Sequence, residues 1–228
     1  MNVDLERLAW QAGRELESAP AQEIVRWAAE TFGARFAVAS SMQDAVLVHL
    51  VSQVAPGVDV LFLDTGYHFA ETLGTRDAVA ATYDVNLITL TPQQTVAEQD
   101  ASYGTTLHDR DPDLCCGVRK VAPLDRALPR YDAWATGLRR VEAPTRAGTP
   151  VVSYDVKRRK VKIAPIAAWT DADVERYIAE HDILVNPLRN AGYRSIGCAP
   201  CTRTVTAREG QRAGRWAGSG KTECGIHQ

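Results

Sequence analysis

The chain contains five cysteines, and their spacing points to chemistry rather than to structural pairing. They form an adjacent pair, a CxxC pair and one isolated residue: Cys115 and Cys116, Cys198 and Cys201, and Cys224. Their number is odd, and a reducing compartment disfavours disulfides. We therefore interpret four of the thiols as ligands of one metal centre and the fifth as free.

The paired cysteines favour an iron–sulfur cluster over a single zinc ion. Cys198 and Cys201 form a knuckle in which both sulfurs can reach one centre. Cys115 and Cys116 would point to opposite faces of a strand, whereas a turn or helix lets both approach a bulky cluster. A [4Fe–4S] cluster takes four thiolates at separated corners, while structural zinc is usually held by two CxxC-like pairs. We predict a [4Fe–4S] cluster, with structural zinc as the alternative.

Cys224 is the candidate nucleophile. It follows a glycine-rich stretch, residues 214–220, whose composition predicts a mobile tail over 208–228. A thiol on such a tail is poorly placed for structure and well placed for chemistry. Nearby cations would lower the pKa of the thiol and supply thiolate, and these are Arg212, Arg215, Lys221 and His227. The alternative is an incidental exposed cysteine on a frayed tail.

Basic residues cluster around these cysteines. Lys120 follows the adjacent cysteine pair, and Arg139 and Arg140 follow a predicted strand. Guanidinium groups bind phosphate and sulfate oxygens with two parallel hydrogen bonds. A nucleic-acid surface is the competing interpretation, and the formal net charge of −2 disfavours it. We interpret residues 157–160 as solvated surface charge.

Two polar segments follow predicted strands. Ser40 and Ser41 end one strand and open a helix, so their hydroxyls and the helix N-terminus could hold a phosphate or sulfate. Asp64 and Thr65 follow the next strand and could contact a ribose or base. Ligands of an open parallel sheet bind beyond the carboxyl ends of its strands, where both segments would lie. A plain helix cap and a simple turn are the alternatives.

A short segment near the C-terminus imitates a phosphate-binding P-loop. Residues 218–222 read GSGKT, but the full pattern requires glycine where Arg215 stands and a helix afterwards. We therefore reject nucleotide binding of that type.

Hydrophobic patterning predicts the elements that position these residues. Short apolar runs alternating with helical periodicity predict βαβ crossovers and a parallel sheet flanked by helices, which is an α/β fold. The predicted strands span 35–40, 58–64, 86–90 and 132–136, followed by a hairpin over 151–166; the predicted helices span 21–32, 45–54, 69–83 and 171–181, the last with Thr170 as N-cap. Residues 186–228 show little periodicity.

Composition bounds the remaining possibilities. A length of 228 residues fits one domain, which we place at 1–207, followed by the tail at 208–228. The longest apolar run, Ala45–Val51, is far shorter than the roughly 18 residues of a membrane span. The first residues lack the apolar core of a secretory signal. We expect a cytoplasmic protein without a membrane or nucleic-acid partner.

Several motifs together resemble one known family. From Phe36 to the last residues the chain contains, in order, SSMQDAVL, LDTGYHFAET, CCGVRKVAPL, TGLRR, NPLRNAGYRSIGCAPCTR, GRW and ECGIH. The set resembles the bacterial assimilatory adenylyl-sulfate (adenosine 5′-phosphosulfate) reductases, which are relatives of the phosphoadenylyl-sulfate reductases. One departure is Glu142-Ala143-Pro144, where a serine-containing segment is expected.

The resemblance implies a fold, a cofactor and a set of contacts. The fold would be adenine-nucleotide α-hydrolase-like, with residues 40–44 as a degenerate pyrophosphatase loop that does not cleave ATP. Cys115, Cys116, Cys198 and Cys201 would ligate [4Fe–4S]. Positions that contact the phosphosulfate or lie near it would be Lys120, Arg212, Arg215 and His227, and Arg139 and Arg140 match an arginine pair whose role is less defined.

The expected reaction is reduction of adenylyl sulfate to sulfite and AMP through an S-sulfocysteine on Cys224. Thioredoxin or a glutaredoxin-like dithiol would supply the electrons. The alternatives are phosphoadenylyl-sulfate reduction and a non-enzymatic iron–sulfur redox sensor. The oligomeric state stays open, a homo-oligomer included.

Overall fold

A single mixed sheet forms the centre of the fold. The computed structural model describes residues 4–206 and 208–227. Its six strands lie in the order β3-β2-β1-β4-β6-β5, and neighbours are parallel except for the antiparallel β5–β6 pair. The strands are β1 (Phe36–Ser40), β2 (Val58–Leu63), β3 (Val85–Leu90), β4 (Ala133–Thr136), β5 (Val152–Asp155) and β6 (Lys160–Ile163). The predicted parallel sheet is confirmed, and the predicted hairpin gives it an antiparallel edge.

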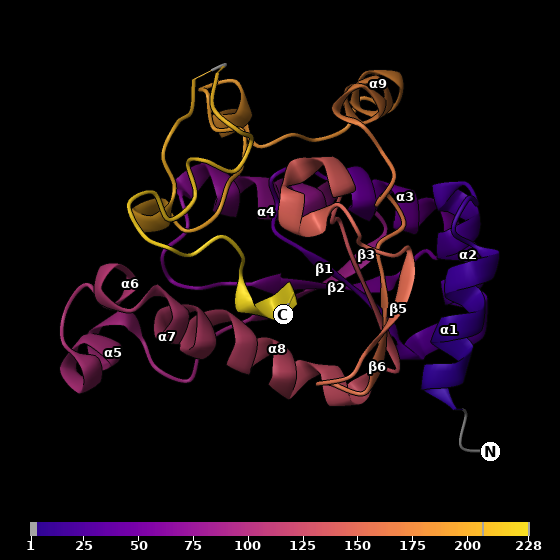
Figure 1. The fold of residues 1–228 in the computed structure, drawn as a ribbon, viewed down its shortest axis with the longest axis horizontal. Coiled ribbons are helices and arrows are strands. Elements are labelled where there is room, and N and C mark those ends of the chain that lie inside the picture. The colour runs from indigo at the N-terminus through magenta and orange to yellow at the C-terminus, as the bar shows by residue number, and fades with distance from the viewer. Residues whose placement is uncertain (1–3, 207, 228) are drawn as a thin grey trace.

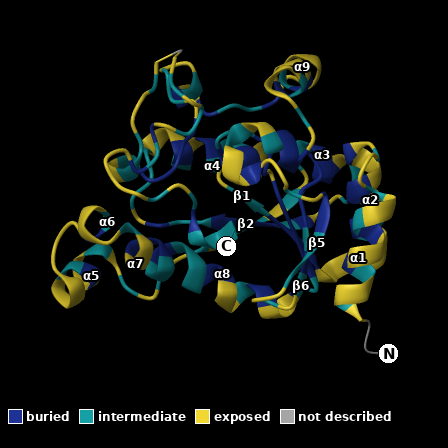
Figure 2. Cartoon of the chain, in the orientation of Figure 1, coloured by how far each residue is buried: buried dark blue, intermediate teal, exposed yellow. Residues whose placement is uncertain are grey.

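Both faces of the sheet are covered by packed side chains. Successive side chains of a strand alternate between the two faces, so each strand contributes to both cores. On β4, Ala133 and Ala135 join the larger core, whereas Trp134 joins a smaller core with Leu124 and Leu128. Figure 2 shows buried strands at the centre and exposed outer faces on α1, α2, α5 and α9. Apolar burial on both faces accounts for the nearly continuous hydrophobic character of the central strands.

Helices surround the sheet (Figure 1). They are α1 (Leu5–Glu15), α2 (Ala21–Phe32), α3 (Val46–Val54), α4 (Ala70–Thr82), α5 (Val96–Tyr103), α6 (Leu107–Arg110), α7 (Pro112–Cys116), α8 (Ala122–Ala127) and α9 (Asp171–His181). The predicted helices are confirmed to within one residue at each end. The Thr170 side chain accepts a hydrogen bond from the Asp173 backbone N–H, as expected of an N-cap. Among the described residues, no helix combines the length and apolar character needed to cross a bilayer.

One helical segment carries much of the site. Helix α7 runs into a π-helical turn, η2 (Gly117–Val121), and η2 runs into α8. The segment begins with a defined cap, because the Asp111 carboxylate accepts the Leu114 N–H at 2.9 Å and proline occupies the first turn. It therefore presents the adjacent cysteines and Lys120 from one continuous support.

The C-terminal segment folds back over the sheet. The Arg203 N–H donates to the Gly214 carbonyl at 2.9 Å, and the Trp216 N–H donates to the Cys201 carbonyl at 2.9 Å. In Figure 1 the last turn, η8 (Gly225–His227), lies above α8 near the middle of the view. The segment is thus packed in this structure, and its mobility stays a prediction. The predicted boundary between domain and tail falls after residue 207, which lies outside the described residues.

Candidate active site

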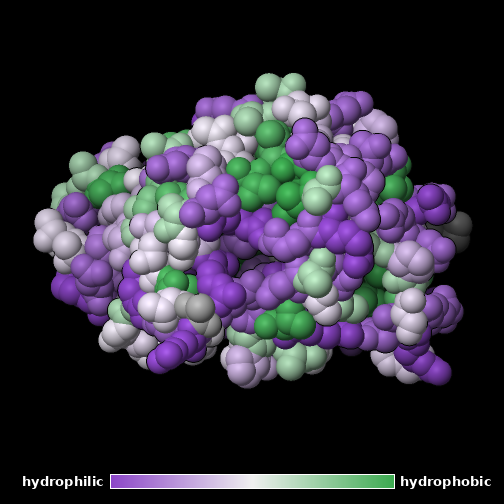
Figure 3. All heavy atoms as spheres, turned by 90° about the horizontal axis from the view of Figure 1, so that it is seen from above, coloured by the Kyte–Doolittle hydropathy of each residue, from purple (hydrophilic) through white to green (hydrophobic). Residues whose placement is uncertain are grey.

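A cleft opens where the strand order reverses. Strands β2 and β3 extend the sheet to one side of β1, and β4 lies on its other side, so the carboxyl ends of β1 and β4 form the switch point. The cleft there holds about 190 Å³ of water-accessible space. In the view from above, hydrophilic residues surround a hollow near the middle of the molecule (Figure 3).

Most of the predicted substrate contacts border this cleft. Ser40 and Ser41 follow β1, and Arg139 follows β4. The others come from η2 and from the C-terminal segment: Lys120, Arg212, Arg215, Cys224 and His227. Segments far apart in the chain therefore converge on one cleft that carries several basic side chains.

Four cysteines border a second, smaller cavity. Its lining includes Cys115, Cys116, Cys198 and Cys201 together with Trp216, and it leaves only about 10 Å³ of water-accessible space. All of the cysteines are free thiols. Cys115 and Cys116 end a helix, and Cys201 closes a tight turn by donating its N–H to the Cys198 carbonyl at 3.0 Å. Helix and turn thus place all four cysteines at the border of one cavity, and their joint ligation of a metal stays a prediction.

The thiols are crowded and shielded from water. Burial, and next the proximity of Cys198, raises the pKa of Cys115 to about 11 and that of Cys201 to about 11. The protonated thiols are therefore favoured until a cation compensates the thiolate charge. Among the residues that the structure describes, no group of three or more His, Cys, Asp and Glu side chains converges as a ready-made site for one metal ion.

Thr65 and Asp64 lie outside the cleft lining. The Thr65 hydroxyl is 3.3 Å from the Cys198 sulfur, and the Thr65 carbonyl accepts a hydrogen bond from buried Arg119. The Asp64 carboxylate accepts the Gly66 N–H at 3.0 Å and lies 3.7 Å from the Arg76 guanidinium. Thr65 therefore supports the cysteine cavity, and Asp64 shapes the turn after β2, so neither is placed as the expected ribose or base contact.

Cys224 lies between the cleft and the other cysteines. It borders the cleft, is 7% exposed, and packs against Cys116 and Trp216. A hydrogen bond from the Cys116 thiol lowers the pKa of Cys224, burial opposes the shift, and Lys120, the Ile226 N–H and Arg215 reinforce it. Lys120, the Ile226 N–H and Arg215 therefore stabilise the Cys224 thiolate independently of Cys116.

The charge that stabilises Cys224 differs from the sequence-based expectation. Lys120 and Arg215 act on it, whereas the Lys221 ammonium is paired with Asp113. Burial disfavours the charge of Lys120, but Coulombic attraction to Cys198 and Cys224 raises its pKa overall. Lys120 also borders both the cleft and the cysteine cavity. A permanent positive charge therefore lies between the two sulfur sites.

Arginine side chains from distant segments of the chain line part of the cleft and make it basic. The buried Arg146 guanidinium donates to both Glu223 oxygens, at 2.8 and 2.6 Å, and Arg212 lies 3.2 Å from the same carboxylate. Burial and next the charge of Arg146 lower the pKa of Arg212 to about 10. The Nε atoms of Arg212 and Arg215 are buried without a hydrogen-bond partner among the described residues. These N–H groups leave donor capacity for phosphate or sulfate oxygens.

His227 is buried as a neutral imidazole. Burial, and next Lys162, holds its pKa well below the usual range. Its ring is parallel to that of Trp134, with centroids 6.4 Å apart, and its Nδ1 has no partner in the described part of the chain. His227 can therefore act as a hydrogen-bonding group at the cleft and does not supply the positive charge expected of it.

The adjacent arginines after β4 point to different places. Arg139 borders the cleft and pairs with Asp171 at 2.8 Å. The Arg140 guanidinium pairs with Glu17 at 2.5 Å and donates to the Thr149 carbonyl at 2.8 Å, so it is not brought to the cleft. Glu142, in the atypical segment, accepts the Arg139 backbone N–H at 3.2 Å and also borders the cleft.

Several residues of the cleft had no distinct signal in the sequence. Arg146 lies in an irregular loop, and its partner Glu223, which is outside the cleft lining, stands next to Cys224 without a recognisable partner nearby in the sequence. His68 borders the cleft while its Nε2 contacts the Leu63 carbonyl at 2.8 Å. Asp44, also in the cleft, belongs to the loop whose serines were singled out, so proximity alone could have indicated it.

The chain matches the phosphoadenosine phosphosulfate reductase domain family over residues 34–204. It belongs to this reductase family. Relatives named adenosine 5′-phosphosulfate reductase extend the similarity over nearly the whole chain. The Streptomyces coelicolor protein is 67% identical over 98% of this chain and 95% of its own length, and the Mycolicibacterium smegmatis protein is 58% identical with the same coverage. The resemblance inferred from the motifs, and with it the expectation of a reductase enzyme, is confirmed.

Solved structures agree with the family's fold. A phosphoadenylyl-sulfate reductase from Candida auris, solved as a phosphate complex, superposes with a TM-score of 0.76 at 29% identity, covering 88% of this chain and 97% of that one. The Candida glabrata FMN adenylyltransferase, at 12% identity and a TM-score of 0.56, covers 88% of this chain and 74% of its own and shares the fold alone. The cleft described above therefore lies in an α/β fold that this reductase and the adenylyltransferase share with the chain.

Proposed function

We propose that the chain reduces adenylyl sulfate to sulfite and AMP, using Cys224 as the nucleophile and a thioredoxin or glutaredoxin-like dithiol as electron donor. One observation carries the proposal: Cys224 borders the basic cleft, whereas the other four cysteines border a separate cavity. The free thiol is thus the one that a bound nucleotide would meet. We place this reaction in the cytoplasm, where dithiols are kept reduced.

The cleft would hold the substrate by its anionic groups. Arg212 and Arg215 offer unpartnered N–H groups, and Ser40 and Ser41 offer hydroxyls at the end of β1. Two anionic groups of adenylyl sulfate and the Cys224 thiolate would otherwise repel one another. The permanent charge of Lys120 offsets that repulsion and stabilises the charge developing on the leaving phosphate.

The reaction would proceed in two balanced steps. The Cys224 thiolate attacks the sulfate sulfur, the S–O bond to the phosphate breaks, and AMP leaves with that electron pair. The enzyme then carries Cys–S–SO₃⁻. One thiolate of the donor attacks the Cys224 sulfur and displaces sulfite, and the second donor thiol resolves the mixed disulfide, so that the dithiol loses two electrons. The donor can reach Cys224 only after the tail leaves its packed position.

The four remaining cysteines fit a [4Fe–4S] cluster. They border one cavity, and two of them are adjacent in the chain, a spacing that suits separated cluster corners better than one tetrahedral ion. Cys115, Cys116, Cys198 and Cys201 would hold it, with the Thr65 hydroxyl beside the Cys198 sulfur. When bound, the cluster would supply a fixed electrostatic centre next to Lys120, while the electrons come from the dithiol. Structural zinc is the alternative, and an iron and sulfide count decides between them.

Adenylyl sulfate is preferred over phosphoadenylyl sulfate as the substrate. The relatives at 67% and 58% identity are named for the former, whereas the Candida auris structure at 29% identity is named for the latter. The four paired cysteines also match the cluster-bearing branch that the motifs resemble. A competition assay with both nucleotides tests the choice, and preferential turnover of the 3′-phosphorylated nucleotide contradicts it.

Mass spectrometry tests the chemistry directly. After mixing with adenylyl sulfate and no reductant, a sulfite-sized adduct should appear on the peptide that contains Cys224 and disappear when dithiol is added. Cys224→Ser is the matched control and should form no adduct and release no sulfite. Normal sulfite release by Cys224→Ser would disprove the mechanism. A cluster that cycles between redox states without any nucleotide turnover would instead support a redox sensor.

A further inference from the structure

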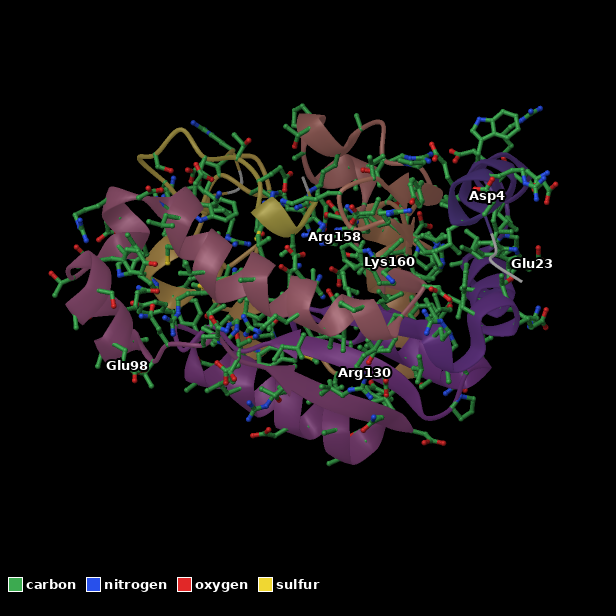
Figure 4. All side chains as sticks on the ribbon, turned by 90° about the horizontal axis from the view of Figure 1, so that it is seen from below. Asp4, Glu23, Glu98, Arg130, Arg158 and Lys160 are labelled. Carbon is green, nitrogen blue, oxygen red and sulfur yellow. The ribbon has the colours of Figure 1, made fainter. Side chains whose placement is uncertain are left out.

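The carbonyl oxygens of the C-terminal turn are held by the β5–β6 hairpin. The Arg158 Nη1 donates to the Ile226 carbonyl at 3.2 Å, and the Lys162 ammonium lies 3.5 Å from the His227 carbonyl. In the view from below, Arg158 reaches from the hairpin toward the C-terminal turn (Figure 4). These contacts act on η8, the turn that begins directly after Cys224.

Arg158 is a buried connector, and this corrects the interpretation of the hairpin tip as solvated charge. Its side chain is 4% exposed. Its guanidinium pairs with Asp155 at 3.0 Å and Asp125 at 2.7 Å, and lies 5.8 Å from the centre of the Trp134 ring. Two carboxylates compensate its charge, which a single backbone carbonyl could not do.

The partners of Arg158 connect the turn to the helix that carries the cysteine pair. Asp125 lies on α8, which continues from η2 and α7, and Asp155 ends β5. The turn itself packs closely, because a Cβ atom added at Gly225 would lie 3.1 Å from Val121 in η2. Ile226 packs against the smaller core. The position of Cys224 relative to Lys120 therefore depends on how firmly this turn is docked.

We propose that Arg158 is a positioning residue that holds the C-terminal turn in place, so that Cys224 faces the cleft. It does not border the cleft and takes no part in binding the nucleotide. Losing its charged donor leaves the Ile226 carbonyl without that bond and shifts the turn toward an undocked state in which Cys224 is accessible to solvent. The proposal rests on the proposed function only for the chemistry of Cys224, because the docking itself can be measured without turnover.

Alkylation of Cys224 by iodoacetamide measures docking in the cluster-loaded protein. Mass spectrometry of the tryptic peptides assigns the alkylated cysteine, and visible absorption verifies that the cluster is retained. In Arg158→Gln we expect Cys224 to react about tenfold faster than in the wild type, the effect of losing one charged hydrogen bond. Arg158→Lys keeps a cationic donor and should react at an intermediate rate. Lys157→Ala removes an exposed neighbouring charge and should leave the rate unchanged.

A kinetic separation distinguishes positioning from general destabilisation. In single-turnover reactions with adenylyl sulfate, Arg158→Gln should form the Cys224 adduct about tenfold more slowly at saturating substrate. The dissociation constant of AMP should stay within about twofold of the wild type, because Arg158 does not border the cleft, and Arg158→Lys should restore part of the adduct rate. Unchanged alkylation and adduct rates in a cluster-loaded Arg158→Gln protein would overturn the proposal.

A second variant covers the case in which Arg158→Gln does not fold. Asp125→Asn keeps Arg158 and its bond to Ile226 but removes one carboxylate that orients the guanidinium, and Asp125 is partly exposed. We expect its Cys224 to alkylate about threefold faster, an effect in the range of a partly exposed ion pair. No change in that variant and in Arg158→Lys would overturn the proposal. If alkylation follows these expectations while Cys224→Ser still releases sulfite, the docking role stands and the proposed chemistry fails.

Discussion

The Lys120 ammonium lies close enough to Cys224 to lower the pKa of that thiol, and it borders the cavity of the other four cysteines as well. This placement comes from η2, whose turn follows directly on the adjacent cysteines. One cation thereby acts on the nucleophile, on the proposed metal ligands and on any anion in the cleft.

Neutralising Lys120 should slow formation of the Cys224 adduct. Lys120→Met keeps much of the length and apolar stem and removes the charge. We expect the single-turnover rate to fall about 100-fold or more, as is typical when one group that stabilises transition-state charge is lost. Quenched-flow mass spectrometry measures the rate, with exposed Lys157→Met as control. A decrease of less than about threefold would show that the charge is not needed for sulfur transfer.

The two arginines after β4 should differ sharply in their effects. Arg139→Ala removes a buried cation at the cleft and should weaken AMP binding about tenfold. Arg140→Ala removes a pair with Glu17 whose side chains are 28% and 43% exposed, so AMP binding should change by less than about twofold. Isothermal titration calorimetry compares them. Equal losses in the two variants would mean that both side chains reach the nucleotide.

Arg212 should contribute to nucleotide affinity through its free N–H. Arg212→Lys keeps the charge but loses the planar group that can make two parallel hydrogen bonds, and we expect AMP affinity to fall about tenfold. The control, Arg203→Ala, lies in the same C-terminal region but is half exposed and paired with Glu209. Binding is measured at two salt concentrations. Wild-type affinity in Arg212→Lys would exclude a direct contact.

The docking of the C-terminal segment should depend on pH through Glu223. Burial raises the pKa of this carboxyl, but Arg146 and Arg212 lower it more, so it ends below the ordinary value of 4.5. Because the pKa of Glu223 is lower in the folded state, its stabilisation of the docked segment is complete above about pH 4.5. That stabilisation is lost as the pH falls further. Amide exchange of residues 222–227, corrected for intrinsic rates, should therefore be flat from pH 8 to 6 and rise below 4.5.

Replacing the same carboxylate removes that pH dependence. Glu223→Gln should reduce protection of residues 222–227 by about 3 kcal/mol at pH 7, because it leaves buried Arg146 without its bidentate partner. The control is exposed Glu180→Gln, which should match the wild type. Protection that still decreases below pH 4.5 in Glu223→Gln would assign the titration to another group.

Iron content should distinguish the four cysteines of the cavity from Cys224. Cys198→Ser, and likewise serine at each of the other three cavity cysteines, should lower iron to less than about half of the wild-type amount, because a cluster corner loses its thiolate. Cys224→Ser should retain full iron and an unchanged visible spectrum. Anaerobic purification with iron and sulfide analysis measures both. Loss of iron in Cys224→Ser would place that sulfur on the metal instead.

Elements with a strong local pattern could be predicted from the sequence. Residues 21–32 and 171–181 are confirmed as helices, because an apolar stripe defines the first and a capping threonine the second. Residues 91–131 gave no prediction, since α6 and α7 are too short for a helical period to emerge. The CC and CxxC spacings constrain which sulfurs can converge, and the division of the cysteines into four ligands and one free thiol stays a prediction.

Contacts between distant segments could not be predicted. The Glu223 carboxylate accepts hydrogen bonds from Arg146, 77 residues away. The Ile226 carbonyl accepts one from Arg158, 68 residues away. Nothing in the local sequence marks either arginine as buried, and a charged hairpin tip is ordinarily solvated. The side-chain directions of Arg139 and Arg140 could not be predicted either, because side chains in irregular backbone do not alternate between faces as they do in a strand.

The π-helical turn at Gly117–Val121 has a consequence for how this site could arise or be lost. A π turn contains one residue more than an α turn, and each residue of a regular helix advances the side chains by about 100°. Because the extra residue is absorbed as a bulge, removing one position here would close the turn into a regular helix and leave α7 and α8 in register. The side chains of the turn itself, Lys120 among them, would point in new directions, so a single in-frame codon deletion would displace this cation while the adjacent cysteines and Asp125 keep their places.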